Sequence, residues 1–398
     1  MDDIKKNNRR HFLKVTAAGL AGAALLPTNT DAKTKKNRTV IYRTLGRTGV
    51  KLPIVSMGAM RGDAKALIEG GIATGIVHFD TAHVYQKGKN ETMLGEVLQN
   101  HNVSKLFIAT KVVPNDMDRK TGLIGEACTA EKFLADLDIS LERLQMKRVD
   151  LLYVHAVSSK QAVLHPEIIR AVKLAKAQGK CKYLGVSTHK NEPEVIRAAM
   201  EAGIYDVVLT AYNFKQDHRE ELKLAIAEGA AYGLGFVAMK TMAGGFLDKD
   251  QTDAVNTKAA LKWALLDENI CTAIPGFTSF EQMEESFSVM EKLKLSKQEE
   301  RDLEFARDYA GLYCNACNRC DGQCQKNLPI PEIMRSYMYS YGYRNMRKAK
   351  LLLAEMGVEN DPCASCDTCT VSCVKNFAVG EKVQSVSRLV DVPDEFIV

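Results

Sequence analysis

Eight of the eleven cysteines in this chain lie between residues 314 and 373. They form two runs of identical spacing, Cys314-x2-Cys317-x2-Cys320-x3-Cys324 and Cys363-x2-Cys366-x2-Cys369-x3-Cys373. Clustered thiolates at this spacing are ligands of iron–sulfur clusters or of zinc, and clustering of this kind favours metal over disulfides. A zinc ion needs only four thiolates, so the third closely spaced cysteine of each run favours iron–sulfur clusters. Structural zinc remains the alternative.

Four polar side chains can carry a second kind of chemistry. Asp80, Tyr85, Lys111 and His155 lie at or just past the ends of three consecutive predicted strands. They suit reversible carbonyl reduction, in which hydride reaches carbon and a proton reaches the developing alkoxide. Tyr85 can supply the proton if a cation, Lys111, lowers the pKa of its phenol from the usual ~10. We expect Asp80 to hold Lys111 charged, and His155 to donate a hydrogen bond to the substrate oxygen.

Short apolar runs that alternate with longer amphipathic runs predict the elements that position these residues. A hairpin is predicted over residues 42–52. The predicted strands are 54–58, 77–81, 106–111, 149–155, 183–187, 207–212, 235–240 and 271–275. The predicted helices include 64–74, 131–144, 166–178, 194–202, 219–228 and 258–266. Several are expected to end at a glycine that adopts the left-handed conformation, namely Gly75, Gly179, Gly203 and Gly229.

Eight βα units that close on themselves make a (β/α)8 TIM barrel of ~250 residues, and residues 40–295 supply that length. An open doubly wound sheet is the runner-up, but no Gly-x-Gly-x-x-Gly follows the first strand. In a barrel the four polar residues fall on the carboxyl-end face, where such folds carry out catalysis. Residues 305–385 are predicted to form a separate small domain around the cysteines, and residues 332–356 between the two runs are predicted to be helical.

The net charge of +5 is concentrated at the beginning of the chain. Residues 1–38 hold nine Lys and Arg side chains against three Asp, which leaves the remainder close to neutral. A near-neutral body offers no broad basic face for a phosphate backbone, so we do not expect a nucleic-acid partner.

The strand-end motifs resemble those of the aldo/keto reductase family. Residues 77–85 (VHFDTAHVY), with Asn90-Glu91 and Leu94-Gly95, resemble the family's second-strand signature. Residues 108–111 (IATK) and 149–155 (VDLLYVH) are similar to its next two. The resemblance covers roughly residues 40–295 and implies an NADP- or NAD-dependent oxidoreductase that acts on CH–OH and C=O groups.

The resemblance also implies where the nicotinamide cofactor binds. The positions that match are Ser187, Thr188, Met239, Lys240, Gly276 and Glu285. Thr188 stands where the family usually has asparagine, Leu209 replaces a frequent glutamine, and Met239 occupies a position often held by an aromatic ring. Residues 278–285 contain no Lys or Arg to meet a 2′-phosphate, which leaves the choice between NADP and NAD open.

The cysteine runs resemble ferredoxin-type ligation of two [4Fe–4S] clusters, in which the fourth cysteine of each run binds the other run's cluster. This resemblance implies one ligand set of Cys314, Cys317, Cys320 and Cys373. It implies a second set of Cys363, Cys366, Cys369 and Cys324. Here Gln325 and Val374 follow the fourth cysteines, where the ferredoxin pattern has proline.

Residues 1–32 resemble a twin-arginine signal peptide, because Arg9-Arg10 precedes a mild apolar run and a small-residue cleavage site. That route exports folded proteins, and it predicts a location in the periplasm or on the outer face of the cytoplasmic membrane. A disordered basic tail on a cytoplasmic protein is the alternative. The apolar run is about half of the ~20 residues that a transmembrane helix needs, so none is expected.

Two functions compete at this point. The first is an enzyme that acts on a small carbonyl or alcohol substrate, such as a sugar, with the clusters relaying electrons to a redox partner protein. The second is an electron-transfer or interaction protein on a barrel that has lost turnover. Clusters that serve only to stabilise the fold are a third possibility.

Overall fold

The computed structural model describes residues 40–62, 64–119, 121–248, 252–308, 312–314 and 316–397. The predicted signal segment, residues 1–32, lies outside them. Within these ranges, no helix combines the length and the apolar character needed to cross a bilayer.

A two-stranded hairpin precedes the barrel, as the sequence predicts. β1 (Tyr42–Thr44) pairs antiparallel with β2 (Lys51–Pro53). Leu45 and Leu52 are fully buried and pack on barrel-interior side chains such as Leu151 and Val237. The hairpin therefore contributes to the interior core of the barrel.

Eight parallel strands form the barrel, and each pairs with its sequence neighbour. They are β3 (Met57–Gly58), β4 (His78–Asp80), β5 (Phe107–Val112), β6 (Val149–Val154), β7 (Cys181–Thr188), β8 (Val207–Ala211), β9 (Gly235–Met239) and β10 (Ile270–Ala273). The first and last strands meet, because the Ser56 N–H donates to Ala273 O at 2.8 Å and the Ala273 N–H donates to Ile54 O at 2.9 Å. The predicted (β/α)8 barrel is confirmed, and the open doubly wound sheet is excluded.

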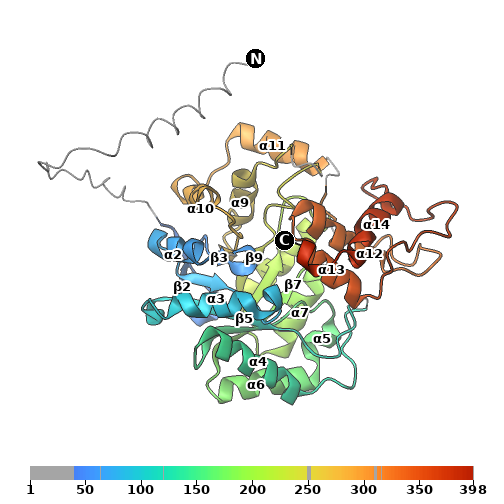
Figure 1. The fold of residues 1–398 in the computed structure, drawn as a ribbon. Helices are drawn as coiled ribbons and strands as arrows, with labels where there is room; N and C mark the ends of the chain where they lie inside the picture. Colours follow the sequence, from blue (N-terminus) through green and yellow to red (C-terminus); the bar gives the residue numbers. More distant parts are fainter. Residues whose placement is uncertain are drawn as a thin grey trace, which may run out of the picture. The chain divides into compact units, whose positions relative to one another are not determined.

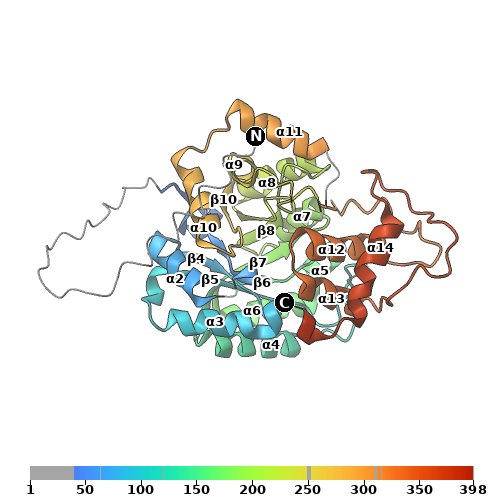
Figure 2. The ribbon, with the colours of Figure 1, turned by 45° about the horizontal axis from the view of Figure 1, so that its top comes forward.

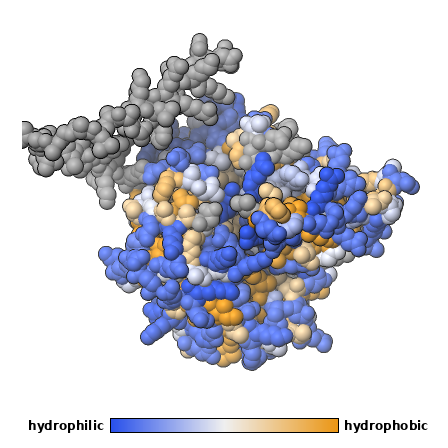
Figure 3. All heavy atoms as spheres, viewed as in Figure 1, coloured by the Kyte–Doolittle hydropathy of each residue, from blue (hydrophilic) through white to orange (hydrophobic). Residues whose placement is uncertain are grey.

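Helices surround the strands (Figures 1 and 2). They are α2 (Lys65–Thr74), α3 (Lys89–Leu98), α4 (Ala130–Leu144), α5 (Lys160–Leu164), α6 (Pro166–Ala177), α7 (Glu192–Ala202), α8 (Arg219–Tyr232), α9 (Thr257–Leu265), α10 (Phe280–Phe287) and α11 (Lys297–Asp308). In α4, the Thr129 side chain caps the first turn by accepting from the Lys132 N–H, and Phe133 and Leu137 recur on the buried face. The outer faces of the helices are mainly hydrophilic in the view of Figure 3.

One predicted helix end is wrong. α8 runs through Gly229 and ends at Gly233, which adopts the left-handed conformation at φ 105°. Gly229 is instead a packing position, since a Cβ there would lie 2.6 Å from the Phe236 ring. A glycine needed for close approach and a glycine that ends a helix look alike in sequence.

The C-terminal region is helical and has a small apolar core of its own. It contains α12 (Ile330–Tyr337), a π-helical turn (Met338–Gly342), α13 (Met346–Glu355) and α14 (Val379–Ser387). Its core includes Ile333, Leu353 and Val383, and the cysteines pack around it. The helical character predicted for residues 332–356 is confirmed, and the segment is divided into two helices because the π-turn intervenes and Asn345 caps α13 by accepting from the Lys348 N–H.

The barrel and the C-terminal helices belong to one compact unit that extends from Thr39 to Val398. α12 contacts the carboxyl end of the barrel, where Glu332 lies 3.8 Å from the Lys190 ammonium just after β7. The helices that follow the barrel in sequence therefore help to build its catalytic end.

Candidate active site

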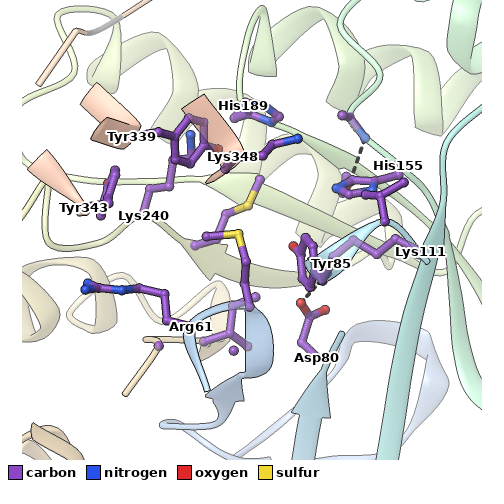
Figure 4. Close-up of a pocket in the computed structure, with 18 of the residues that line it drawn as sticks. Arg61, Asp80, Tyr85, Lys111, His155, His189, Lys240, Tyr339, Tyr343 and Lys348 are labelled. Atoms are coloured by element: carbon purple, nitrogen blue, oxygen red, sulfur yellow. Dashed lines mark hydrogen bonds and ion pairs between the residues drawn. The ribbon is translucent and has the colours of Figure 1, made fainter. Parts of the chain in front are cut away.

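The four predicted catalytic residues lie in one pocket at the carboxyl ends of the strands (Figure 4). Asp80 is the last residue of β4, and Tyr85 begins a short 3-10 turn five residues later. Lys111 lies in β5, and His155 directly follows β6. Neighbouring strands of the barrel thus bring together residues that span 75 positions of sequence.

Lys111 is the centre of the polar contacts in this group. Its ammonium and the Asp80 carboxylate form an ion pair, and each residue is only 1% exposed. The same ammonium donates to Thr81 O at 2.6 Å and to the Tyr85 hydroxyl at 3.2 Å. Burial disfavours the ammonium, but the Asp80 carboxylate and the Tyr85 hydroxyl together outweigh this effect and raise the pKa of Lys111. Lys111 is therefore held charged beside the phenol.

The phenol of Tyr85 does not titrate near neutrality. Burial raises its pKa above the usual 10, and the opposing effect of Lys111 is smaller. The expectation that Lys111 brings this pKa down is therefore wrong in its net direction, because desolvation is the larger effect. Tyr85 remains a neutral hydrogen-bond and proton donor across the physiological pH range.

His155 completes the polar side of the pocket. Its ring lies edge-on to the Tyr85 ring, with 5.8 Å between the ring centroids. Burial, together with the charges of Lys111 and Lys348, lowers its pKa well below the usual 6.5. The imidazole is neutral, and its Nδ1 has no hydrogen-bond partner among the described residues. It retains hydrogen-bonding capacity toward a substrate oxygen.

Four of the six predicted cofactor residues also line the pocket, namely Ser187, Met239, Lys240 and Gly276. Thr188 does not, since its hydroxyl donates to Lys190 O at 2.8 Å. Glu285 is exposed on α10, outside the pocket. The structure thus brings four of the positions that the resemblance assigns to the cofactor beside the predicted catalytic residues, and it leaves Thr188 and Glu285 outside the pocket.

Several lining residues had no signal in the sequence. They are Arg61, Arg119, His189, Arg335, Tyr339, Tyr343 and Lys348. The last four come from the C-terminal helices and the turn between them. No spacing rule links positions near 340 to strand ends near 80, so only the fold reveals that they share a pocket.

The eight clustered cysteines divide into two groups of four, each around its own cavity. Cys314, Cys317, Cys320 and Cys373 line one cavity. Cys324, Cys363, Cys366 and Cys369 line the other. Each group thus contains three cysteines of one run and the fourth of the other. None of the eleven cysteines forms a disulfide, and within the described residues no three His, Cys, Asp or Glu side chains converge closely enough to hold a single metal ion.

The family model for the aldo/keto reductase family matches residues 59–258, about half of the chain. The chain therefore belongs to the aldo/keto reductase family. It is 26% identical to an L-galactose dehydrogenase of Arabidopsis thaliana over 63% of this chain and 88% of that protein. It is 29% identical to an L-glyceraldehyde 3-phosphate reductase of Escherichia coli over 38% of this chain and 46% of that protein.

Solved structures agree with the fold. The holo form of an aldo-keto reductase from Bacillus halodurans aligns with a TM-score of 0.55 at 22% identity, over 67% of this chain and 96% of that chain. The thermostable aldo-keto reductase Tm1743, solved with the inhibitor epalrestat, gives a TM-score of 0.54 at 22% identity over 67% and 99%. These alignments leave about a third of the chain without a counterpart.

Proposed function

We propose that this protein interconverts a carbonyl and an alcohol in the pocket around Tyr85, with a nicotinamide cofactor as the hydride carrier. The observation that carries the proposal is the contact of the Lys111 ammonium with both the Asp80 carboxylate and the Tyr85 hydroxyl. His155 beside them can hold the substrate oxygen. A bound nicotinamide supplies hydride for reduction and accepts it in oxidation.

The chain's own residues handle the proton and the developing charge. Tyr85 donates its proton to the oxygen as the alkoxide forms, and the adjacent Lys111 stabilises the resulting phenolate. His155 donates a hydrogen bond that fixes the carbonyl and offsets the growing negative charge. In the reverse direction the Tyr85 phenolate accepts the proton of the alcohol.

The raised pKa of Tyr85 predicts opposite pH profiles for the two directions. Reduction uses the protonated phenol, so kcat/KM for a carbonyl substrate should stay flat from pH 6 to 9. Oxidation uses the phenolate, so kcat/KM for the matching alcohol should rise about tenfold per pH unit up to ~10. The measurement is the pH dependence of both directions with one carbonyl–alcohol pair. A plateau of alcohol oxidation near pH 7 would contradict the assignment of Tyr85 as the base.

Four positions that the resemblance assigns to the cofactor line the pocket. Ser187 and Met239, at the ends of β7 and β9, suit the nicotinamide, and Lys240 and Gly276 suit the diphosphate. Residues 278–285 provide no cation for a 2′-phosphate, so we leave the choice between NADP and NAD to a binding measurement. The two relatives are a sugar dehydrogenase and a sugar-phosphate reductase, which favours a sugar or another small polyol as the substrate.

We further propose that the C-terminal cysteines hold two [4Fe–4S] clusters. The support is that each of two cavities is lined by three cysteines of one run and the fourth of the other, which matches the crossed ligand sets of the two-cluster ferredoxin pattern. The two cysteine runs also end in the same kind of turn. The Asn327 N–H donates to Cys324 O, and the Asn376 N–H donates to Cys373 O, both at 2.9 Å. Such clusters carry single electrons, here to or from a redox partner protein, or they stabilise the domain.

The crossed ligand sets make a prediction about metal content. Anaerobically purified protein should contain about eight iron and eight sulfide, and Cys373→Ala should lower both to about four. The surviving cluster should be the one associated with the run from Cys363, even though Cys373 belongs to that run. Cys181→Ala, which removes a buried thiol in β7, is the control. Two zinc ions per chain in the wild-type protein would contradict the proposal.

A second candidate function is electron transfer on a barrel without turnover. It is favoured by Thr188 and Leu209, because the Thr188 hydroxyl is engaged by Lys190 and Leu209 is fully buried. In the family pattern the amide side chains at these two positions hold the carboxamide of the nicotinamide, and neither Thr188 nor Leu209 provides an amide. Loss of carbonyl reduction in Tyr85→Phe would exclude this alternative.

We propose export by the twin-arginine route for residues 1–32, with a cytoplasmic location as the alternative. The Arg9-Arg10 pair before an apolar run supports this proposal. The proposed iron–sulfur clusters also support it, because this route exports proteins that have already folded with their cofactors. Cell fractionation of the full chain beside an Arg9→Lys/Arg10→Lys variant tests it. Retention of the variant in the cytoplasm, with export of the wild type, is the expected result.

A further inference from the structure

The C-terminal helices add positive charge to the active-site pocket. Arg335 comes from α12, Lys348 from α13, and Tyr339 from the π-helical turn between them. Lys240, which follows β9, lies against Tyr339, with its ammonium 4.9 Å from the ring centroid. We call Lys240, Arg335, Tyr339 and Lys348 the cationic wall. In Figure 4 Tyr339, Lys240 and Lys348 border the cavity on one side, and Tyr85 and Asp80 border it on another.

The carboxylates around the pocket do not balance this charge. Glu332 pairs with Arg335 at 2.9 Å, and Glu355 pairs with the neighbouring Arg119 at 2.5 Å. Among the described residues, no carboxylate lies within ion-pair distance of the ammonium groups of Lys240 or Lys348. Burial lowers the pKa of both lysines, which is the effect expected of cations that lack a counter-ion.

Arg335 provides an unsatisfied donor in the same wall. It is 7% exposed, and its Nε has no hydrogen-bond partner among the described residues. Its Nη2 contacts His189 Nε2, and burial together with Arg335 keeps that imidazole neutral by lowering its pKa well below 6.5. A buried guanidinium with a free N–H is a group that binds oxyanions.

Tyr339 responds to the field of this wall. Burial alone would raise the pKa of its phenol, but Lys240, Arg335 and Lys348 lower it to about 7. The three cations therefore favour negative charge at the position of this hydroxyl. An anionic ligand would benefit from the same field.

We infer that the pocket selects carbonyl substrates that carry an oxyanion, a carboxylate or a phosphate, which Arg335 and Lys348 bind. Arg335 and Lys348 line the same pocket as Tyr85 and His155, so one substrate can present its oxyanion to the first pair and its carbonyl to the second. This inference rests on the proposed function, because it names the substrate class of the same pocket. Ser187 and Met239 remain for the nicotinamide.

Calorimetric titration of the full-length, cluster-loaded protein with acetate and with inorganic phosphate tests the inference without turnover. We expect at least one anion to bind in the presence of saturating nicotinamide cofactor, and Lys348→Met and Arg335→Met each to weaken it by about 10- to 100-fold. The stronger of the two anions identifies the oxyanion. Arg347→Met, on the same helix but outside the pocket, should bind like the wild type.

Three results would overturn the inference. The first is that neither anion binds, and the second is that Lys348→Met leaves anion binding unchanged. The third is loss of anion binding when the cofactor is present, which would assign the cationic wall to the cofactor's diphosphate.

Kinetics separate this inference from the proposed function. With D-glucuronate, D-glucose 6-phosphate and D-glucose as matched aldehydes, Lys348→Met should lower the ratio of kcat/KM for an anionic sugar to kcat/KM for glucose at least tenfold. Anion binding without reduction of any carbonyl would refute the proposed function and leave the oxyanion site in place. If glucose is reduced with the same kcat/KM as both anionic sugars, the oxyanion site is refuted and the proposed function stands.

Discussion

Tyr85→Phe is expected to lower kcat for carbonyl reduction by about 10²- to 10⁴-fold, the range over which a positioned proton donor contributes. The variant keeps the ring, its edge-on contact with His155 and the packing of the pocket, and it removes only the hydroxyl that Lys111 contacts at 3.2 Å. The dissociation constant of the nicotinamide cofactor should be unchanged. Steady-state kinetics beside a cofactor titration measure both quantities.

Tyr183→Phe is the matched control, because it removes a phenol hydroxyl from the hairpin side of the barrel. The Tyr183 hydroxyl donates to Thr48 O at 3.2 Å, far in the fold from the pocket. This variant should retain wild-type kcat. A Tyr85→Phe protein that reduces carbonyls as fast as Tyr183→Phe would show that the proton comes from elsewhere.

Lys111→Met is expected to abolish activity and to destabilise the barrel by about 3–5 kcal/mol, because it leaves the Asp80 carboxylate buried without its partner. Both residues are 1% exposed, so water cannot replace the lost ammonium. Replacing the pair together, in Asp80→Leu/Lys111→Met, should restore most of the stability and none of the activity. Urea unfolding and kinetics on the three proteins test this.

Lys262→Met provides the comparison for Lys111→Met. Lys262 is 3% exposed and pairs with Glu299 at 2.7 Å, away from the pocket. Its loss should reduce stability and leave kcat near the wild-type value. If Lys111→Met also kept its kcat, the role of Lys111 would be structural only.

The barrel could be predicted from the sequence because each of its strands is a short apolar run between longer amphipathic ones. The catalytic group followed from the same pattern, since Asp80, Lys111 and His155 stand at the ends of adjacent parallel strands. Local periodicity determines both features. The partition of the eight cysteines between two cavities matches the ferredoxin-like ligand sets, whose metal content stays a prediction.

Other features depend on contacts that periodicity does not encode. The net rise of the pKa of Tyr85 depends on how completely the pocket excludes water, which the residue types alone do not fix. The break between α12 and α13 depends on a π-turn that places Tyr339 over Lys240. Arg335 meets His189 across 146 positions of sequence, so their shared pocket had no sequence signal.

The most direct test of the central claim is the fate of deuterium from a C4-deuterated nicotinamide cofactor during reduction of an aldehyde by the anaerobically purified protein. The account predicts an alcohol that carries one deuterium at its carbinol carbon, formed in a one-to-one ratio with oxidised cofactor, and no such product from Tyr85→Phe. Oxidation of the cofactor without a deuterated alcohol, with the electrons recovered only in an added redox dye, would contradict it and favour electron transfer on a barrel without turnover.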